Sequence, residues 1–184
     1  MSLLKVAVPA AAAAVAAAVW WRHWRRSGSK LGGDAAVGVI GLGVMGAQLL
    51  MNLAEKLETP IAGLDMDDGK AKAAIELAQS EGGLPVCTFT HTAAFVAALR
   101  KPRVVLLLVP AGRAVDGACA ALSELLERGD LVVDMGNEHF ELTEARQAAF
   151  HRKGVHFMGC GTSGGEKGAR YGPCPPNPHP NPPP

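Results

Sequence analysis

Residues 37–46 read VGVIGLGVMG, and this stretch decides the fold. A short apolar run, typical of a buried strand, leads into the glycines Gly41, Gly43 and Gly46, and a helical pattern follows at once. A second apolar run ends at Asp65, about 20 residues further on, which is the usual spacing between a phosphate-binding glycine turn and an acidic ribose ligand. The arrangement predicts a strand–turn–helix unit that binds a dinucleotide.

Each glycine has a separate physical task in such a turn. Gly41 permits the tight turn, Gly43 leaves room for a pyrophosphate to approach the backbone, and Gly46 lets the helix pack close to the strand. The free N–H groups and the positive dipole end of the helix then face the phosphates. The competing interpretation is a turn that binds nothing.

Length and composition narrow the class of protein. The 184 residues are 48% hydrophobic, which suits one domain with appendages. The formal net charge of +1 gives no basis for nucleic-acid binding. The four cysteines are widely spaced and the six histidines form no ligand motif, so we expect reduced thiols in a reducing environment and no metal site. The cysteines are Cys87, Cys119, Cys160 and Cys174.

Residues 1–33 contain no acidic residue, and residues 6–21 form an unbroken apolar stretch with basic residues on both sides. Three interpretations remain open: a membrane anchor that uses residues 3–21, a cleaved organelle presequence, and a secretory signal. We favour the first two and therefore expect membrane anchoring or organelle targeting. In each case residues 1–33 serve as a targeting signal or a membrane anchor and lie outside the folded domain.

The other end, residues 173–184, reads PCPPNPHPNPPP. Proline lacks a backbone donor and cannot complete a sheet or a helix, so we expect an extended, disordered tail. Residues 34–172 remain as the dinucleotide-binding domain.

Strand and helix signals alternate through this domain, with short loops between them. We therefore expect an α/β fold of Rossmann type: a doubly wound, mainly parallel sheet with helices on both faces and no second domain. Strands are expected at residues 35–40, 61–64, 86–89, 104–109, 131–134 and 155–158, and helices at residues 45–57, 70–80, 93–99, 114–127 and 141–153.

Ligands of open α/β sheets bind at the carboxyl ends of the strands, so the loops there are the candidate site. Asp65 can accept hydrogen bonds from both ribose hydroxyls of NAD, whereas a neighbouring arginine would suit the 2′-phosphate of NADP. Met66 and Asp67 follow instead, so charge favours NAD. The competing interpretation is that Asp67 only begins the next helix.

Two further loops carry polar groups. Asn137 follows the strand at residues 131–134, where its amide can bridge cofactor and substrate or simply form an Asx turn. Ser163, Gly164 and Gly165 offer N–H groups and a hydroxyl that suit a carboxylate or phosphate, or else form a flexible loop. The charged residues at 166, 167 and 170 are interpreted as surface charges, and no loop supplies a catalytic base.

Together these loops resemble the 6-phosphogluconate dehydrogenase family over residues 35–173. The matching strings are GLGVMG (41–46), KPRVVLLLVPAG (101–112), GDLVVDMGN (129–137) and KGVHFMGCGTSGGEKGARYGP (153–173). The last string is the most specific, because GLGVMG is shared with the wider group of β-hydroxyacid dehydrogenases.

The resemblance implies oxidation of 6-phosphogluconate by a nicotinamide dinucleotide, followed by loss of CO2 to give ribulose 5-phosphate in the pentose phosphate pathway. It implies cofactor contacts at Gly41, Leu42, Gly43, Val44, Met45, Gly46, Asp65, Met66, Asp67, Val109, Pro110, Ala111 and Asn137. It implies substrate contacts at Asn137, Ser163, Gly164 and Gly165.

The chain also departs from the family pattern. NADP is the family default, but its NADP-linked members have Asn-Arg-Thr where Asp65, Met66 and Asp67 stand, and a lysine where Pro110 stands. Met135 replaces a glycine beside Asn137. The missing arginine and the presence of Asp65 tilt the expectation toward NAD.

The resemblance places the catalytic lysine and glutamate, the phosphate-binding arginines and the homodimer interface after the YGP segment, in a helical second domain. We therefore expect no catalytic residue in this chain and no turnover by it alone, as for a truncated cofactor domain. Apolar surface near Phe157 and Tyr171 would then lie exposed. The alternatives are another β-hydroxyacid dehydrogenase and a non-catalytic, membrane-tethered nucleotide-binding module.

Overall fold

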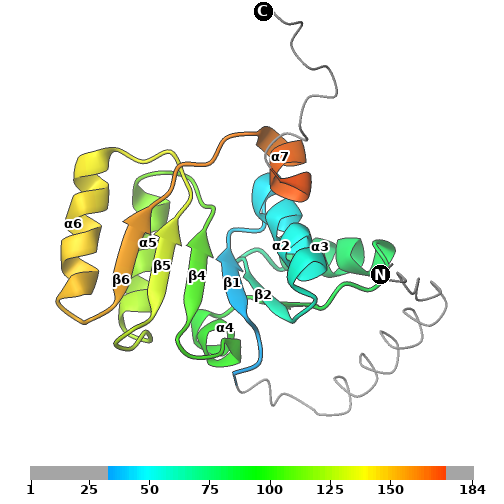
Figure 1. Ribbon diagram of the computed structural model, residues 1–184, viewed down its shortest axis with the longest axis horizontal. Coiled ribbons are helices and arrows are strands. Elements are labelled where there is room, and N and C mark those ends of the chain that lie inside the picture. The colour runs from blue at the N-terminus through cyan, green and yellow to red at the C-terminus, as the bar shows by residue number, and fades with distance from the viewer. Residues whose placement is uncertain (1–32, 173–184) are drawn as a thin grey trace, which may run out of the picture.

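The computed structural model describes residues 33–172, which form one six-stranded parallel sheet in the order β3-β2-β1-β4-β5-β6 (Figure 1). The strands are β1 (Val37–Ile40), β2 (Ile61–Leu64), β3 (Val86–Phe89), β4 (Val104–Leu107), β5 (Leu131–Asp134) and β6 (His156–Gly159). The helices are α2 (Val44–Leu57), α3 (Asp68–Ser80), α4 (Thr92–Ala98), α5 (Arg113–Ser123), α6 (Phe140–His151) and α7 (Gly165–Tyr171). The expected doubly wound α/β fold is confirmed.

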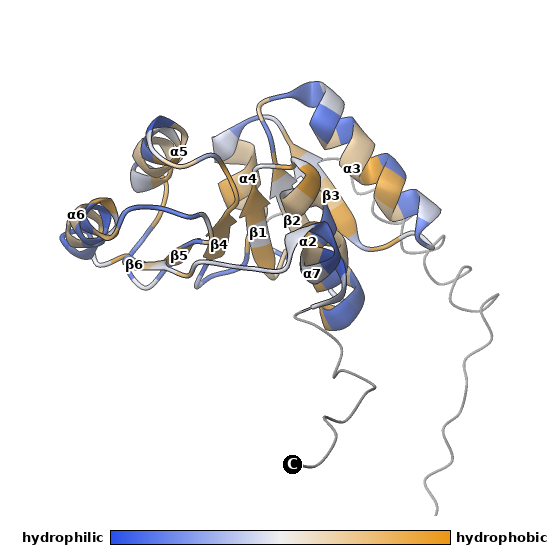
Figure 2. Cartoon of the chain, turned by 90° about the horizontal axis from the view of Figure 1, so that it is seen from above, coloured by the Kyte–Doolittle hydropathy of each residue, from blue (hydrophilic) through white to orange (hydrophobic). Residues whose placement is uncertain are grey.

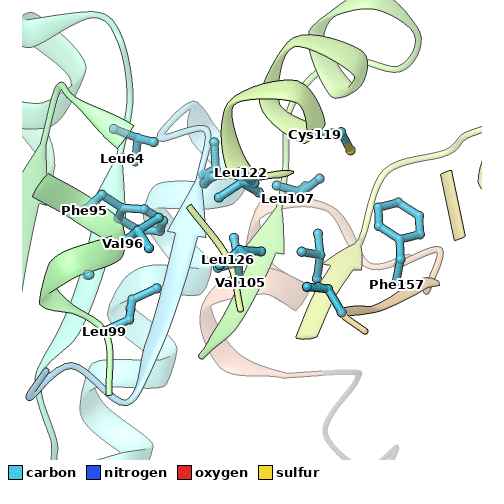
Figure 3. Packing of buried hydrophobic residues seen from close by; sticks show 14 of the residues in the cluster. Leu64, Phe95, Val96, Leu99, Val105, Leu107, Cys119, Leu122, Leu126 and Phe157 are labelled. Atoms are coloured by element: carbon cyan, nitrogen blue, oxygen red, sulfur yellow. The ribbon is translucent and has the colours of Figure 1, made fainter. Parts of the chain in front are cut away.

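The two faces of the sheet have separate cores because successive side chains of a strand point to opposite sides. On one face, Val39 and Ile61 are fully buried against α2 and α3. On the other, Val105 and Leu107 pack with residues of α4, α5 and α6, as the close-up of Leu107 and Leu122 in Figure 3 illustrates. Figure 2 shows α4, α5 and α6 on one side of the sheet and α2 with α7 on the other.

The direction in which strands are added to the sheet reverses at β1, the first strand. β1 pairs with β2 on one side and with β4 on the other, in each case in parallel. The chain therefore leaves β1 toward one half of the sheet and later returns to build the other half. A crevice outside the carboxyl ends of the strands forms at such a switch point, and this is where doubly wound folds bind their ligands.

Helix α7 is the one described element that the sequence analysis missed. It packs beside α2, where Asn52 donates a hydrogen bond to the carbonyl oxygen of Ala169 at 3.0 Å. Gln48 contacts Glu166 one turn earlier along both helices, so α2 and α7 run in the same direction. Their first turns consequently lie at the same end of the pair.

Arg170 was interpreted as a surface charge, and that interpretation is wrong. Its side chain is only 12% exposed and its guanidinium reaches Glu55 and Glu81, each at 2.6 Å. These ion pairs connect α7 to α2 and to the residue that ends α3. Glu166 and Lys167 are exposed, as expected of surface charges, and Glu166 accepts a hydrogen bond from Gln48 at 3.3 Å. Polar contacts therefore hold α7 in place.

The expectation of exposed apolar surface is half right. Tyr171 is 74% exposed, but Phe157 is buried and stacks on Phe150 with ring centroids 5.4 Å apart. Phe150 is the buried aromatic residue of α6, and its ring covers Phe157. The domain as described therefore has a closed core around this ring.

The expectations for residues 1–32 and 173–184 lie outside the described residues. Within residues 33–172, no helix combines the length and the apolar character that crossing a membrane requires. The anchor or targeting role of residues 1–33, the disorder of the tail and the domain boundaries stay predictions.

Candidate functional site

The carboxyl ends of all six strands meet at one edge of the sheet, because every pairing is parallel. The loops that follow β1, β2, β4, β5 and β6 therefore lie along this edge, which is the upper edge of the sheet in Figure 1. These loops, with the first turns of α2 and α7, contain every residue that the sequence analysis selected for cofactor or substrate binding.

The glycine turn after β1 has the geometry that its sequence predicts. Gly41 has a φ of 94°, which disfavours any residue with a side chain. A Cβ atom on Gly46 would overlap the carbonyl oxygen of Gly41, so the close packing of helix on turn requires glycine there. A Cβ atom on Gly43 would meet nothing within 4 Å. The turn itself therefore does not need a glycine at position 43, and the space above it is open.

The start of α2 is suited to an anion. Gly43 is its N-cap residue, no side chain accepts a hydrogen bond there, and the first turn holds no acidic residue. The first N–H groups of a helix lack partners within the helix, and its dipole is positive at this end. The open space at Gly43 gives a phosphate access to these donors. The residues present therefore fit a bound pyrophosphate.

Asp65 links the turn after β1 to the end of β2. Its Oδ2 accepts a hydrogen bond from the Leu42 amide and its Oδ1 accepts one from the Asp67 amide, each at 2.9 Å. The side chain is 13% exposed and lies 3.8 Å from the ammonium group of Lys70. An ionised carboxylate has about four acceptor positions, so it can still accept hydrogen bonds from ribose hydroxyls.

The neighbours of Asp65 have different roles. Asp67 caps α3 by accepting hydrogen bonds from the amides of Gly69 and Lys70, as the competing interpretation of this residue proposed. Its side chain is therefore engaged with its own helix. Met66 is 87% exposed, so an apolar side chain stands in the solvent where a 2′-phosphate ligand would be expected.

A cavity of about 520 Å³ lies beside the glycine turn. It brings together predicted residues from three loops, namely Gly41, Asp65, Met66 and Val109. Arg113, in the first turn of α5, also lines it and was not selected from the sequence. Among residues 33–172, Arg113 has no carboxylate within ion-pair distance.

A second cavity, of about 380 Å³, lies at the ends of β5 and β6. Asn137 lines it together with Gly136, Cys160 and Gly161. Ser163, Gly164 and Gly165 follow as an exposed segment, and the hydroxyl of Thr162 donates to the carbonyl oxygen of Met135 at 3.1 Å. The structure thus ties the predicted substrate loop to the strand end that carries Asn137.

The other predicted contacts differ in exposure. Leu42 is buried, Val44 is 65% exposed, and Pro110 and Ala111 are exposed in the loop after β4.

The cysteines of the described residues are free. Burial raises the pKa of the Cys87 thiol to about 12 and that of the Cys119 thiol to about 11, whereas Cys160 is exposed. Within residues 33–172, no group of three potential metal ligands comes together.

Sequence reasoning missed a buried ion pair between Glu138 and Arg146. Glu138 Oε2 accepts hydrogen bonds from the Gly112 amide and from the Arg146 guanidinium, each at 2.8 Å. These contacts, with the Gly112 amide first, lower the pKa of Glu138 to about 2. A signal existed: Arg146 stands one helical turn before buried Phe150, so a charge occupies the apolar face of α6.

A family model described as the NAD binding domain of 6-phosphogluconate dehydrogenase matches residues 36–175. This chain belongs to that family. The match contains all the loops described above, from the glycine turn to the end of α7.

Curated relatives give the same result. A decarboxylating 6-phosphogluconate dehydrogenase of Spinacia oleracea is 44% identical over 137 residues, which cover 74% of this chain and 28% of the relative. The decarboxylating enzyme of Bacillus licheniformis is 41% identical over 140 residues and is covered to the same extents. The chain therefore spans less than a third of the length of these relatives.

Solved structures agree on the fold. The 6-phosphogluconate dehydrogenase of Plasmodium falciparum superposes with a TM-score of 0.70 at 34% identity, over 74% of this chain and 29% of the other. That enzyme was solved in its apo form, with its cofactor NADP+ and with its substrate 6-phosphogluconate. A 3-hydroxyisobutyrate dehydrogenase of Mycobacterium tuberculosis superposes with a TM-score of 0.62 at 23% identity, which shows the fold alone.

Proposed function

We propose that this chain is the dinucleotide-binding part of a decarboxylating 6-phosphogluconate dehydrogenase. The start of α2 carries the proposal: it lacks a side-chain cap, lacks an acidic residue in its first turn and opens to free space at Gly43. Asp65 hydrogen-bonds to the same turn and has acceptor capacity left for a ribose. A phosphate group and an adjacent ribose fit these two features together.

The proposal gives each loop a role. Gly43 and the first turn of α2 hold the pyrophosphate, and Asp65 holds the adenosine ribose on the β2 side of the switch point. The nicotinamide half then lies toward β4 and β5, near Asn137. A bound nicotinamide dinucleotide would supply the hydride acceptor for oxidation of a secondary alcohol.

Under the same proposal, residues 163–165 and Asn137 orient the substrate. The Asn137 amide both donates and accepts, which suits a sugar hydroxyl. The segment at 163–165 offers exposed backbone N–H groups and a serine hydroxyl, which suit a carboxylate. The substrate of the Plasmodium falciparum relative, 6-phosphogluconate, carries both kinds of group.

Isothermal titration calorimetry on residues 1–184 tests the proposal. We expect saturable binding of ADP-ribose, which contains the ribose and pyrophosphate groups, and tighter binding of the whole dinucleotide. Binding of 6-phosphogluconate is expected to strengthen when the dinucleotide is present, because the two sites adjoin. Failure of ADP-ribose and of both NAD and NADP to bind a folded sample would overturn the proposal.

We further propose that NAD is preferred to NADP. The Asp65 carboxylate and exposed Met66 stand where a 2′-phosphate would need a cation, and a carboxylate there repels a phosphate. The competing choice, NADP, is supported by Arg113, which lines the same cavity as Asp65 and has no ion-pair partner among residues 33–172. If Arg113 binds a 2′-phosphate, Arg113→Ala will weaken NADP and leave NAD unchanged. We expect equal, small effects on both.

A further inference from the structure

One carboxylate joins the loops that follow β4 and β5. Glu138 Oε2 accepts a hydrogen bond from the Gly112 amide, in the loop after β4, at 2.8 Å. The same oxygen accepts a hydrogen bond from Arg146, on α6, at 2.8 Å. Glu138 itself belongs to the loop after β5. The loop after β4, 26 residues before Glu138, and helix α6, which carries Arg146 eight residues after it, therefore meet at a single side chain.

Gly112 is held at both of its backbone groups. Its amide donates to Glu138, and its carbonyl oxygen accepts a hydrogen bond from Arg146 at 3.4 Å. Gly112 is also the N-cap residue of α5, and glycine has no side chain that could cap the helix. Glu138 adds its charge to that of Asp116 in the first turn of α5, where the helix dipole favours negative charge. A carboxylate of the protein itself thus occupies the start of α5, whereas no side chain caps the start of α2.

The pair is buried. The side chains of Glu138 and Arg146 are 7% and 8% exposed. Arg146 also contacts Asp116 at 2.7 Å and lies 3.8 Å from Asp134 Oδ2, a buried atom with no hydrogen-bond partner of its own. Separating the pair would leave the Glu138 carboxylate, at 7% exposure, with backbone N–H donors alone, so the pair resists separation. The two loops are therefore held at a fixed spacing.

The neighbours of this pair are site residues. Ala111, a predicted cofactor contact, precedes Gly112, and Asn137 directly precedes Glu138. We propose that Glu138 and Arg146 are positioning residues that hold these two loops together as one binding surface for the nicotinamide half of the dinucleotide. This inference rests on the proposed function. Neither side chain is proposed to touch the ligand.

The pair is expected to affect binding of the nicotinamide half of the dinucleotide and not binding of the adenosine half. The adenosine half lies against Asp65 and the start of α2, which do not contact the pair. Loss of the pair is therefore expected to leave ADP-ribose binding unchanged and to weaken binding of the complete dinucleotide. A purely structural role would weaken both ligands equally.

The test is calorimetry on residues 1–184 with ADP-ribose, NAD and NADP. For Glu138→Ala we expect the Kd of the preferred dinucleotide to rise about tenfold, toward that of ADP-ribose, while the Kd of ADP-ribose stays within about twofold. Glu138→Gln keeps an acceptor for Gly112 but loses the charge that faces Arg146, and it is expected to give an intermediate loss. Glu124→Gln, in an exposed ion pair with Lys153, is the matched control.

The outcomes are distinguishable. Unchanged dinucleotide binding in both variants, or an equal loss of both ligands, overturns the positioning role while the proposed function stands. If Glu138→Ala does not fold, Glu138→Gln and Arg146→Lys carry the same comparison. Failure of the unaltered chain to bind ADP-ribose and either dinucleotide overturns the proposed function and this inference with it.

Discussion

The carboxylate of Asp65 accepts a hydrogen bond from the Leu42 amide at 2.9 Å, which ties the end of β2 to the glycine turn after β1. The proposed ribose contact and the proposed phosphate-binding turn are therefore parts of one hydrogen-bonded unit. A change at Asp65 acts on the ribose contact and on the turn together, so cofactor selectivity is a more informative measure than affinity alone.

Asp65→Asn is expected to weaken NAD more than NADP. The neutral amide repels a 2′-phosphate less than the carboxylate does and has only one accepting oxygen for ribose hydroxyls and backbone amides. The ratio of the two dissociation constants, measured by calorimetry, is expected to shift toward NADP by several-fold. Asp68→Asn, at an exposed residue paired with Lys72, is the control and is expected to leave the ratio unchanged. An equal loss for both cofactors would show that Asp65 does not hold the ribose.

The glycine turn gives a second prediction, because Gly43 and Gly46 differ in what surrounds them. Gly43→Ala places its methyl group in open space, so the protein is expected to fold with unchanged thermal stability. The same methyl group occupies the path of a pyrophosphate, so ADP-ribose binding is expected to fall by more than about tenfold.

Gly46→Ala provides the matched contrast. Its methyl group would overlap the carbonyl oxygen of Gly41, so helix and turn must separate, and the melting temperature is expected to fall clearly. Differential scanning calorimetry on both variants checks the stabilities. A stable Gly43→Ala that binds ADP-ribose normally would contradict the phosphate site.

The contrast between these glycines shows why part of the fold could be predicted. The turn, the strands and the buried helix faces are encoded locally, in short apolar runs and glycine spacing. Three strands, β2, β3 and β5, have the predicted bounds. Helix α7 was not predicted, because it is short and carries no buried residue. Ion pairs hold it to segments about 90 to 115 residues away in the sequence.

The site could be predicted only in part, because local sequence patterns do not contain the contacts between distant segments. Residues at strand ends were selected because the position of a strand end follows from local pattern. Arg113 and the Glu138–Arg146 pair became visible only when tertiary structure brought separate loops together. Single-sequence patterns do not encode which loops meet.

A third prediction concerns stability alone. Asp130 Oδ2 accepts hydrogen bonds from the Arg103 guanidinium and the Glu127 amide at 2.9 Å, and its side chain is 2% exposed. Asp130→Ala removes the buried partner of the guanidinium, which keeps only the exposed Glu127 carboxylate at 3.5 Å, and is expected to lower the free energy of unfolding by about 3 kcal/mol. Urea denaturation measures this loss. Asp130 precedes β5, at the opposite edge of the sheet from the loops, so ADP-ribose affinity of the folded protein is expected to stay unchanged.

A fourth prediction tests the attachment of α7. Arg170→Met removes the ion pairs to Glu55 and Glu81 but keeps the length of the side chain. The amides of Gly168 and Gly172, which are hydrogen-bonded within α7, are expected to exchange with solvent faster. Hydrogen–deuterium exchange measures the change, and Lys167→Met, at an exposed position of the same helix, is the control. Equal protection in both variants would show that apolar and backbone contacts suffice.

The last prediction follows from the lowered pKa of Glu138. Hydrogen bonds from the Gly112 amide and from Arg146 lower its pKa from 4.5 to about 2, so the folded protein binds a proton there less readily than the unfolded chain. The stabilisation is complete above pH 4.5 and is lost as the pH falls toward about 2. Other carboxylates with lowered pKa, including Glu55 and Glu127, also lose stabilisation in acid.

The contribution of Glu138 is therefore isolated by difference. Urea denaturation of the unaltered chain and of Glu138→Gln is compared at neutral pH and at several acidic values. The gap between their free energies of unfolding is expected to stay constant down to about pH 5 and then to shrink, because only the unaltered chain titrates at this position. A gap that stays constant down to about pH 3 would show that the charge of Glu138 does not stabilise the loops after β4 and β5.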